Sequence, residues 1–301
     1  MEDPIRIPKW FHEAIEASRH VAGRDVFFVI GCQKSGTTWV ERLLNSHPSV
    51  CCMGEGHFSD VAGPMLEQVA KLYNDDARTN YRLSAEGLFA VARLFADQVL
   101  NKYLAACEHP EVIRALGDRT PEGAIGVPAL DALYPGARFI HIIRDGRDGA
   151  VSGWAQLRRQ GDDGKFSGFA EYALYFAKDH WVPYVTRARQ AAAQIAGRYL
   201  ELRYETLQAD PVAQTRRMLA FLGVDASDEI VGACVDGASF RVVSGGRNPG
   251  EEDPKSHYRK GIVGDWKNHF DDETHSRFLK EAGNLLHEIG YADLEQMAGV
   301  T

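Results

Sequence analysis

Hydrophobic and polar positions follow two alternating patterns along the chain. Uninterrupted apolar runs, such as VFFVI at 26–30, are typical of parallel strands covered on both faces. We expect strands at 26–30, 50–53, 138–144 and 199–204. Apolar residues recur at helical spacing at 39–47, 58–107, 167–196 and 211–222, and a further helix is expected to start near Arg147. This alternation predicts an α/β fold with three layers, a mostly parallel sheet with helices on both faces.

The chain shows no internal repeat and no convincing domain boundary. We therefore expect a single domain over residues 1–301, with the helices near 58–110 as an insertion into it. The stretch 244–257 (SGGRNPGEEDPKSH) is rich in glycine, proline and charge, which predicts a mobile loop.

Composition and charge narrow the class of partner. Apolar residues make up 45% of the chain and charged residues 25%, which is ordinary for a globular protein. Lys and Arg number 34 against 42 Asp and Glu, a net charge of −8. This balance argues against a general nucleic-acid or polyanion binder, although it is compatible with a small, concentrated basic pocket.

The sequence also bears on the compartment. No run of 18 apolar residues occurs, so we expect no membrane span. Residues 1–20 carry acids and lack an apolar core, so we do not expect a secretory signal. The five cysteines are an odd number, and the adjacent pair Cys51-Cys52 lacks metal-ligand spacing. We interpret them as reduced thiols of a cytoplasmic protein.

The loop after the first strand carries candidate chemistry. The sequence GCQKSGTT at 31–38 joins a buried strand to a helix, an arrangement that presents backbone N–H groups to an anion. Gly31 and Gly36 have the spacing of a nucleotide P-loop, but Thr37 stands where the lysine would be, and Lys34 lies earlier. Lys34 can reach over an anion while hydroxyls at the helix start hold its other oxygens. We interpret the segment as a P-loop-like anion site.

Two later segments are basic. The stretch 138–159 holds five arginines against two aspartates, and Arg144 at a strand end, followed by Ser152, can hold a phosphate by charge and hydroxyl. In Arg259-Lys260-Gly261, two cations can fold over a phosphate while the glycine allows close backbone approach. Each segment alone is compatible with a solvated surface. Together they predict a second phosphate site.

Three segments resemble, in the same order, motifs of the sulfotransferases that use 3′-phosphoadenosine 5′-phosphosulfate (PAPS). QKSGTTW at 33–39 is similar to their 5′-phosphosulfate loop, IRDGRDGAVS at 143–152 to their 3′-phosphate motif, and RKGIVGDWKN at 259–268 to their C-terminal motif. The resemblance covers nearly the whole chain. It implies an enzyme that moves a sulfuryl group from PAPS to a hydroxyl, phenol or amine of a small-molecule acceptor and needs no metal.

The resemblance also implies a role for each matching residue. The 5′-phosphosulfate would be bound by Lys34, Ser35, Gly36, Thr37 and Thr38. The 3′-phosphate would be bound by Arg144, Ser152, Arg259, Lys260 and Gly261. The adenine would be bound by Trp39, Tyr204, Ser239 and Phe240. Core packing is the alternative for the three aromatic residues of this last group.

Sulfuryl transfer resembles phosphoryl transfer, in which positioning and charge stabilisation supply most of the catalysis. We hypothesise that Lys34 is catalytic and neutralises the charge that builds on the oxygen of the leaving phosphate. The acceptor also needs a base within hydrogen-bond reach.

The sequence departs from part of the family at the expected base. Cytosolic small-molecule sulfotransferases carry a catalytic histidine in a K-T-H-L-P segment, where this chain has Pro121. The departure resembles the branch with bacterial, carbohydrate and tyrosyl-protein enzymes, which implies Glu55 as the base. His57 is the second catalytic candidate, because its ordinary pKa suits neutral pH. Glu122 is a further candidate base, and Arg119 a candidate contact for the sulfonate.

A P-loop kinase or NTPase is the main alternative, and a non-catalytic nucleotide-binding protein is another. The displaced lysine, the second phosphate site and the lack of a clear Mg²⁺-binding acid count against the kinase. We expect the acceptor to lie against 55–110, and a small metabolite is favoured over a sulfated polymer. A homodimer is compatible with the sequence. Apolar and aromatic residues of that segment, which the core can also use, are Phe58, Met65, Tyr73, Tyr81 and Phe89.

Overall fold

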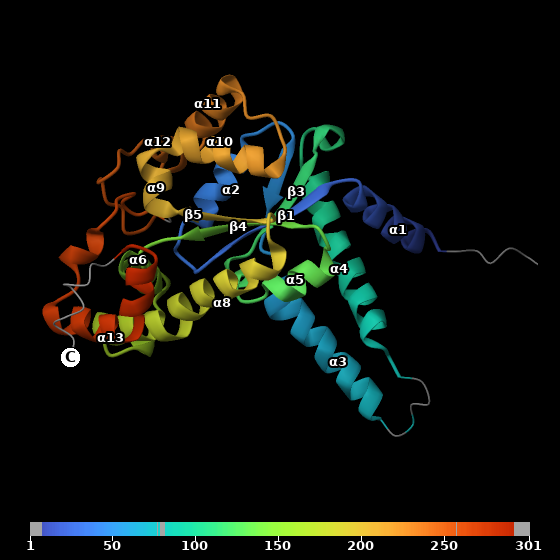
Figure 1. Cartoon of the computed structure of the whole chain (residues 1–301), viewed down its shortest axis with the longest axis horizontal. Helices are drawn as coiled ribbons and strands as arrows, with labels where there is room; N and C mark the ends of the chain where they lie inside the picture. The colour runs from blue at the N-terminus through green and yellow to red at the C-terminus, as the bar shows by residue number, and fades with distance from the viewer. Residues whose placement is uncertain (1–7, 77, 79–81, 257, 292–301) are drawn as a thin grey trace, which may run out of the picture.

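The computed structural model describes residues 8–76, 78, 82–256 and 258–291. At its centre lies a five-stranded sheet with the order β2-β3-β1-β4-β5 (Figure 1). All four neighbouring pairs of strands are parallel, which confirms the predicted parallel sheet. The strands are β1 (Asp25–Gly31), β2 (Val50–Met53), β3 (Ala115–Arg119), β4 (Arg138–Ile143) and β5 (Tyr199–Arg203).

Helices cover both faces of the sheet and make the three layers that the sequence predicts. Alternate residues of β1 enter two separate cores: Phe28 and Ile30 belong to one, and Phe27 and Val29 to the other. The first core is closed by α1 (Lys9–Ala22), α4 (Ala85–Ala105), α5 (Val127–Leu133), α6 (Gly146–Gln160), α7 (Phe169–Tyr175), α8 (Val182–Ala192) and α13 (Asp272–Glu288). The second is closed by α2 (Thr37–Asn45), α9 (Tyr204–Ala209), α10 (Pro211–Leu222) and α11 (Asp228–Gly237).

The strand β3 is the main element that the hydrophobic pattern misses. Its sequence ALGDR contains alanine, glycine and aspartate, which are depleted in strands, and no β-branched residue. It nevertheless lies between β2 and β1 and pairs with both. Gly117 fits there because it lies opposite Phe27, whose ring occupies the space that a side chain would need, with Cζ 2.3 Å from the position of an added Cβ.

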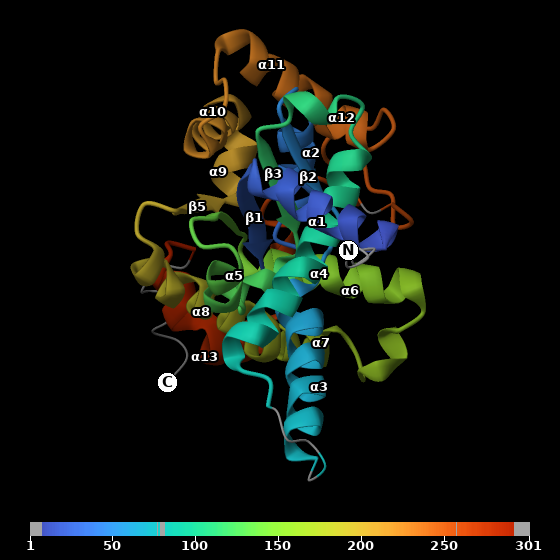
Figure 2. The same ribbon diagram turned by 90° about the vertical axis from the view of Figure 1, so that its right-hand side faces the viewer.

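The helical segment expected over 58–107 is divided into three pieces. A π-helical turn, Phe58–Ala62, leads into α3 (Gly63–Asp75), and α4 follows after a break. Figures 1 and 2 show α3 and the start of α4 projecting from the body of the protein. The apolar face predicted on the first helix is therefore largely exposed, with Met65 at 65% and Leu72 at 64%. The single-domain organisation and the role of this insertion stay predictions.

The stretch expected to be a mobile loop follows α12 (Phe240–Val243) and is joined to the chain beyond it by hydrogen bonds. The guanidinium of Arg247 donates to the carbonyl oxygens of Glu251, Tyr258 and Arg259 at 2.7–3.0 Å. The Gly250 N–H donates to the Lys260 carbonyl oxygen at 2.8 Å. Two residues named from the sequence, Tyr81 and His257, lie outside the described residues.

Two further expectations concern membranes and thiols. Within the described ranges, none of the helices combines the length and the apolar character that a membrane crossing requires. All five cysteines are free thiols, and all except Cys107 are buried.

We predict that Gly117→Ala lowers the free energy of unfolding by about 1–3 kcal/mol, because the added methyl group overlaps the Phe27 ring in a packed core. Urea unfolding followed by circular dichroism measures this change. The control is Gly164→Ala, whose added methyl group has no neighbour within 4 Å, and it should change stability by less than about 0.5 kcal/mol. Equal stability of the two variants would contradict the packing argument.

Candidate functional site

A cavity of about 330 Å³ lies where β1, β4 and β5 end, the edge at which open α/β sheets bind ligands. It is lined by residues from position 34 to position 262. The structure brings together at this cavity all the residues predicted to bind nucleotide except Ser35. Ser35 is buried beside the cavity, and its Oγ has no hydrogen-bond partner among the described residues.

The loop after β1 turns sharply into α2. Lys34 and Gly36 both have positive φ, at 69° and 104°. A side chain at Gly36 would meet the ring of Tyr204, whose Cδ2 lies 2.6 Å from the position of an added Cβ. No described side chain caps the N-terminus of α2, so its first amides and its positive dipole end face the loop region. This is the arrangement that binds anions.

Lys34 is the cation at the centre of this loop. Its Nζ donates a hydrogen bond to Oε1 of Gln156 on α6, at 2.7 Å. Burial, together with the charges of Arg159 and Arg144, lowers the pKa of Lys34 to about 8. An anion placed here would relieve the repulsion among these three cations.

Arg144 connects the loop to the C-terminal segment. Its guanidinium lies 4.5 Å from the centre of the Tyr204 ring and donates to the carbonyl oxygens of Lys34 and Ile262, at 3.4 and 3.2 Å. Its Nε is buried, with no acceptor among the described residues. Because a buried donor without a partner is costly, a bound phosphate would complete the hydrogen bonding of this side chain.

Aromatic side chains form one wall of the cavity. The Trp39 and Tyr204 rings meet edge to face at 5.7 Å, and the Trp39 indole N–H donates to the carbonyl oxygen of Ala238. Gly261 has a φ of 63°, and an added Cβ there would lie 2.5 Å from the ring of Phe240. All three aromatic side chains line the cavity, and Trp39 and Tyr204 also pack against the buried core, so both sequence interpretations apply to these two.

A buried carboxylate, that of Asp148 on α6, holds the C-terminal segment in place. It accepts hydrogen bonds from the backbone N–H groups of Gly264 and Trp266, at 2.7 and 2.9 Å. One of its oxygens also lies 3.8 Å from the guanidinium of Arg144. Burial nevertheless raises the pKa of Asp148, and Arg144 and the two backbone donors oppose this rise.

Acidic side chains hold the two cations of the C-terminal segment. The carboxylate of Asp265 accepts from Arg259 and, at 2.8 Å, from Lys260. Arg259 also pairs with Glu252 at 2.6 Å. Burial alone would raise the pKa of Asp265, but these cations hold it well below its usual range. Carboxylates therefore position both Arg259 and Lys260, the two cations of this segment that are predicted to bind the 3′-phosphate.

The sequence suggests that the arginines of 138–159 form one basic group. In the structure, they lie in different places. Arg144 lines the cavity, whereas Arg147 is buried in an ion pair with Asp145 and lies 3.9 Å from the centre of the Trp266 ring. Arg138, at the other end of β4, faces Asp25 at 3.7 Å. The charge of this stretch is therefore divided among structural and cavity positions.

Two glutamines were missed by the sequence reasoning. Gln156 accepts from Lys34, and Gln208 donates from Nε2 to the Gly261 carbonyl oxygen at 2.6 Å. Each lies four residues after a predicted site residue on a helix, Ser152 and Tyr204 respectively. The helical i, i+4 relation is therefore the signal that could have found them.

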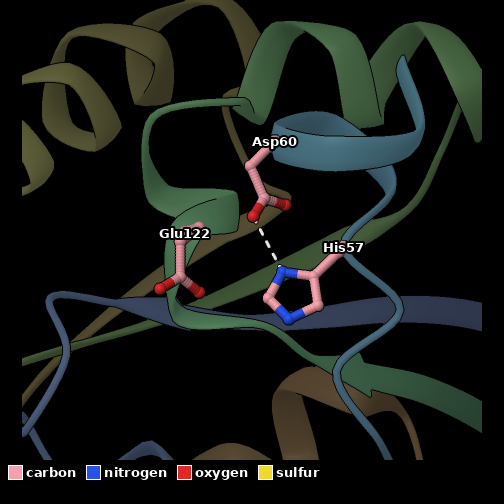
Figure 3. Close-up of side chains that lie close together, drawn as sticks. All are labelled: His57, Asp60 and Glu122. Carbon is pink, nitrogen blue, oxygen red and sulfur yellow. Dashed lines mark hydrogen bonds and ion pairs between the residues drawn. The ribbon is translucent and has the colours of Figure 1, made fainter. Parts of the chain in front are cut away.

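The candidate bases Glu55 and His57 follow β2, and Glu122 follows β3. Figure 3 shows His57 with Asp60 and Glu122. His57 has a φ of 49°, its Nδ1 lies 2.7 Å from the Asp60 carboxylate, and its Nε2 lies 3.6 Å from that of Glu55. Burial lowers the pKa of His57, but the hydrogen bond with Asp60 and the charges of Glu122 and Glu55 raise it overall. A histidine with a carboxylate at Nδ1 keeps Nε2 available to accept a proton.

Arg119, the predicted sulfonate contact, is engaged by two acids. Its Nη1 contacts Glu55, and its Nε donates to Glu41 at 2.8 Å. Glu122 accepts a hydrogen bond from Gln33, the residue before Lys34, so the phosphate loop and this group of candidate bases are adjacent. Ligand atoms of His57, Asp60 and Glu122 lie within 4.8 Å of one another, a grouping that can hold a metal ion.

The residues predicted to meet the acceptor differ in exposure. Phe58 is buried in the core, as the alternative interpretation expects. Met65, Tyr73 and Phe89 are exposed at 65%, 47% and 47% on α3 and α4. Surface for an acceptor is therefore present on these helices, but its use stays a prediction.

Comparisons with known proteins agree on one family. The profile described as "Sulfotransferase family" matches residues 26–228. Cytosolic sulfotransferase 3 of Arabidopsis thaliana is 28% identical over 185 residues, which cover 54% of this chain and 57% of the relative. Protein-tyrosine sulfotransferase 1 of Danio rerio is 24% identical over 212 residues, covering 68% and 55%. The match thus spans little more than half the length of these relatives.

A solved structure gives the same fold. A mouse sulfotransferase crystallised with PAP aligns with a TM-score of 0.57 at 18% identity, over 86% of this chain and 85% of that one. At this level of identity, the likeness concerns the arrangement of the sheet and helices.

We predict that Asp148→Asn lowers the free energy of unfolding by about 1–3 kcal/mol, because one amide oxygen must replace two carboxylate oxygens as acceptors for Gly264 and Trp266. Hydrogen exchange followed by mass spectrometry should show faster exchange over residues 259–268. Asp228→Asn, at a carboxylate 97% exposed, is the control and should leave both measurements unchanged. Unchanged exchange over 259–268 in Asp148→Asn would contradict this role.

Proposed function

Because this chain belongs to the sulfotransferase family, we propose that it transfers a sulfuryl group from PAPS to a hydroxyl, phenol or amine of a small-molecule acceptor. The proposal depends on one observation: a single cavity collects Lys34, Arg144 and Arg259–Gly261. Cations therefore lie at two positions of the cavity, one at the loop after β1 and one at Arg144 and Arg259–Gly261. Two such positions suit PAPS, which carries a 3′-phosphate besides its 5′-phosphosulfate, whereas ATP has no 3′-phosphate. The family match does not favour the nucleotide kinase.

The donor fits this cavity group by group. The amides at the start of α2 and the Lys34 ammonium suit the 5′-phosphosulfate, and Arg144, Arg259 and Lys260 suit the 3′-phosphate. The aromatic wall described above suits the adenine. The mouse neighbour was solved with PAP, the nucleotide that such a transfer releases, which supports this assignment.

The proposed step is an in-line displacement at sulfur. The acceptor oxygen or nitrogen bonds to sulfur as the bond between sulfur and the phosphate oxygen breaks, and the electron pair of that bond stays on the phosphate of the departing PAP. Lys34 stabilises the charge on this oxygen, and its pKa of about 8 keeps it largely protonated at neutral pH. The acceptor proton goes to a base.

The geometry favours His57 over Glu55 as that base. One carboxylate oxygen of Glu55 is already engaged by the guanidinium of Arg119. His57 has Asp60 at Nδ1 and its Nε2 towards Glu55. In this arrangement, Glu55 either orients the His57 ring or accepts the proton itself. The pH profiles described below distinguish these two roles.

The acceptor, the location and the role of metal complete the proposal. We propose a phenol among the acceptors, because the Danio rerio relative is by name a protein-tyrosine sulfotransferase and tyrosine is a phenol. The free thiols support the cytoplasmic location expected from the sequence. We propose that the step needs no metal, since Lys34 and Arg144 supply the positive charge, although the grouping of His57, Asp60 and Glu122 calls for a chelator control.

We predict that the protein transfers ³⁵S-sulfate from PAPS to members of a phenol, alcohol and amine panel, and that Lys34→Ala reduces kcat by about 10²–10³-fold. The reason is the loss of the cation at the leaving oxygen. Lys280→Ala, an exposed lysine on α13, is the matched control and should keep full activity.

A thermal-shift measurement separates donor binding from the choice of acceptor. PAP should stabilise the wild type far more than ATP with Mg²⁺ does. The opposite order of stabilisation would overturn the sulfotransferase proposal in favour of a kinase.

We predict that Asp60→Asn shifts the rising limb of the pH profile of kcat/KM to lower pH. A base acts when deprotonated, so activity rises with pH through its pKa, and the loss of the Asp60 carboxylate removes a charge that raises the pKa of His57. If Glu55 is the base, Asp60→Asn leaves the limb in place and Glu55→Gln abolishes turnover while His57→Gln does not. The profiles should be the same with and without EDTA.

A further inference from the structure

We propose that a second cavity, next to the nucleotide cavity, binds a small aromatic anion. This cavity of about 610 Å³ lies along a different face of α6. Val151, Trp154, Ala155 and Arg158, spaced three and four residues apart, line it, whereas Ser152 lines the nucleotide cavity. The remaining wall comes from Arg159, Phe169, Glu252, Pro254, Lys255, Arg259 and His269.

The charges of this cavity select an anion. Its lining holds four formal cations and a histidine but a single acid, Glu252, in a chain whose net charge is −8. Arg259 is held by Glu252, and the Arg159 guanidinium donates to the Ser256 carbonyl oxygen at 3.0 Å. Within the part of the chain that the structure describes, no carboxylate pairs with Arg158 or Lys255. Two cations of the cavity are thus available for a ligand.

The apolar part of the wall selects an aromatic body. The Trp154 and Phe169 rings lie 6.4 Å apart at an interplanar angle of 59°, and both line the cavity. The Phe169 ring also lies 6.4 Å from that of His269. A flat ring can rest on these side chains while a sulfonate, sulfate or carboxylate group meets Arg158 and Lys255. The ligand class is therefore an aromatic compound with one anionic group.

Arg259 lines both cavities, which couples them. One guanidinium cannot serve an anion on each side equally well, and the two anions also repel each other. The anion and the nucleotide therefore weaken each other's binding, and by linkage the factor is the same in both directions. This coupling rests on the proposed function, whereas the anion site does not.

The test is isothermal titration calorimetry of the full chain with naphthalene-2-sulfonate, whose C–S bond does not donate a sulfuryl group. We expect binding that the double variant Arg158→Ala/Lys255→Ala weakens about tenfold or more. The matched control is Arg187→Ala/Lys280→Ala, at exposed positions on α8 and α13, which should bind as the wild type does. Naphthalene-2-carboxylate tests the other anionic group, and the neutral naphthalene-2-sulfonamide should not bind.

PAP titrations complete the test. PAP binding by the double variant should equal that of the wild type, which also shows that the variant is folded, and saturating naphthalene-2-sulfonate should weaken PAP binding by about fivefold or more in the wild type. If the double variant binds the sulfonate as tightly as the wild type does, the site is overturned, whatever PAP does. If PAP does not bind but the sulfonate does, the proposed function fails and the anion site stands.

Discussion

The cavity that we propose for the nucleotide depends on one buried carboxylate, that of Asp148. The cations of this cavity come from two distant parts of the sequence, the strand ends and the segment 259–261. Tertiary contacts must therefore hold these two parts together. Asp148 does so by accepting two backbone N–H groups from the segment while its charge faces Arg144. A buried charge is tolerated when it is paired and hydrogen-bonded, and both conditions are met here. The same carboxylate therefore positions Arg144 and the segment that carries Arg259 and Lys260.

Gathering cations raises an electrostatic cost that the protein offsets with local acids. Lys34 shows the cost, since burial and two arginines lower its pKa to about 8. Asp265 shows the compensation, because its pKa lies far below its usual range when it holds Arg259 and Lys260. These acids hold the cations in place, so a bound phosphate would meet them already arranged and less side-chain entropy would be lost on binding. The net charge of −8 does not indicate this arrangement, because it sums the charges of the whole chain, whereas the arrangement involves only a few side chains around the cavity.

The sequence predicted those parts of the fold in which local pattern and tertiary environment agree. The apolar run of β1, the loop with Lys34 and the helix α10 are such cases, since each has a local signal. The strand β3 is not, because its glycine and charged residues become a strand only between two neighbours. Arg144 and Arg147 show the same limit at the site. Three residues apart in one basic stretch, one faces the cavity and the other is buried against Trp266, and this difference follows from packing around α6.

A hydrogen bond connects the loop that carries Lys34 to the candidate bases and fixes their relative position. Gln33 donates to Glu122, which belongs to the same group of side chains as His57 and Asp60. The next residue, Lys34, has a φ of 69°, so its side chain leaves the loop in a direction that an ordinary extended or helical residue would not give. Gln33 thus fixes the loop against the bases while Lys34 turns towards Gln156 on α6. Neighbouring residues of one short loop thus reach two different partners, Gln33 at Glu122 and Lys34 at Gln156. In the transfer that we propose, the same loop would hold both the cation for the leaving group and the link to the candidate bases.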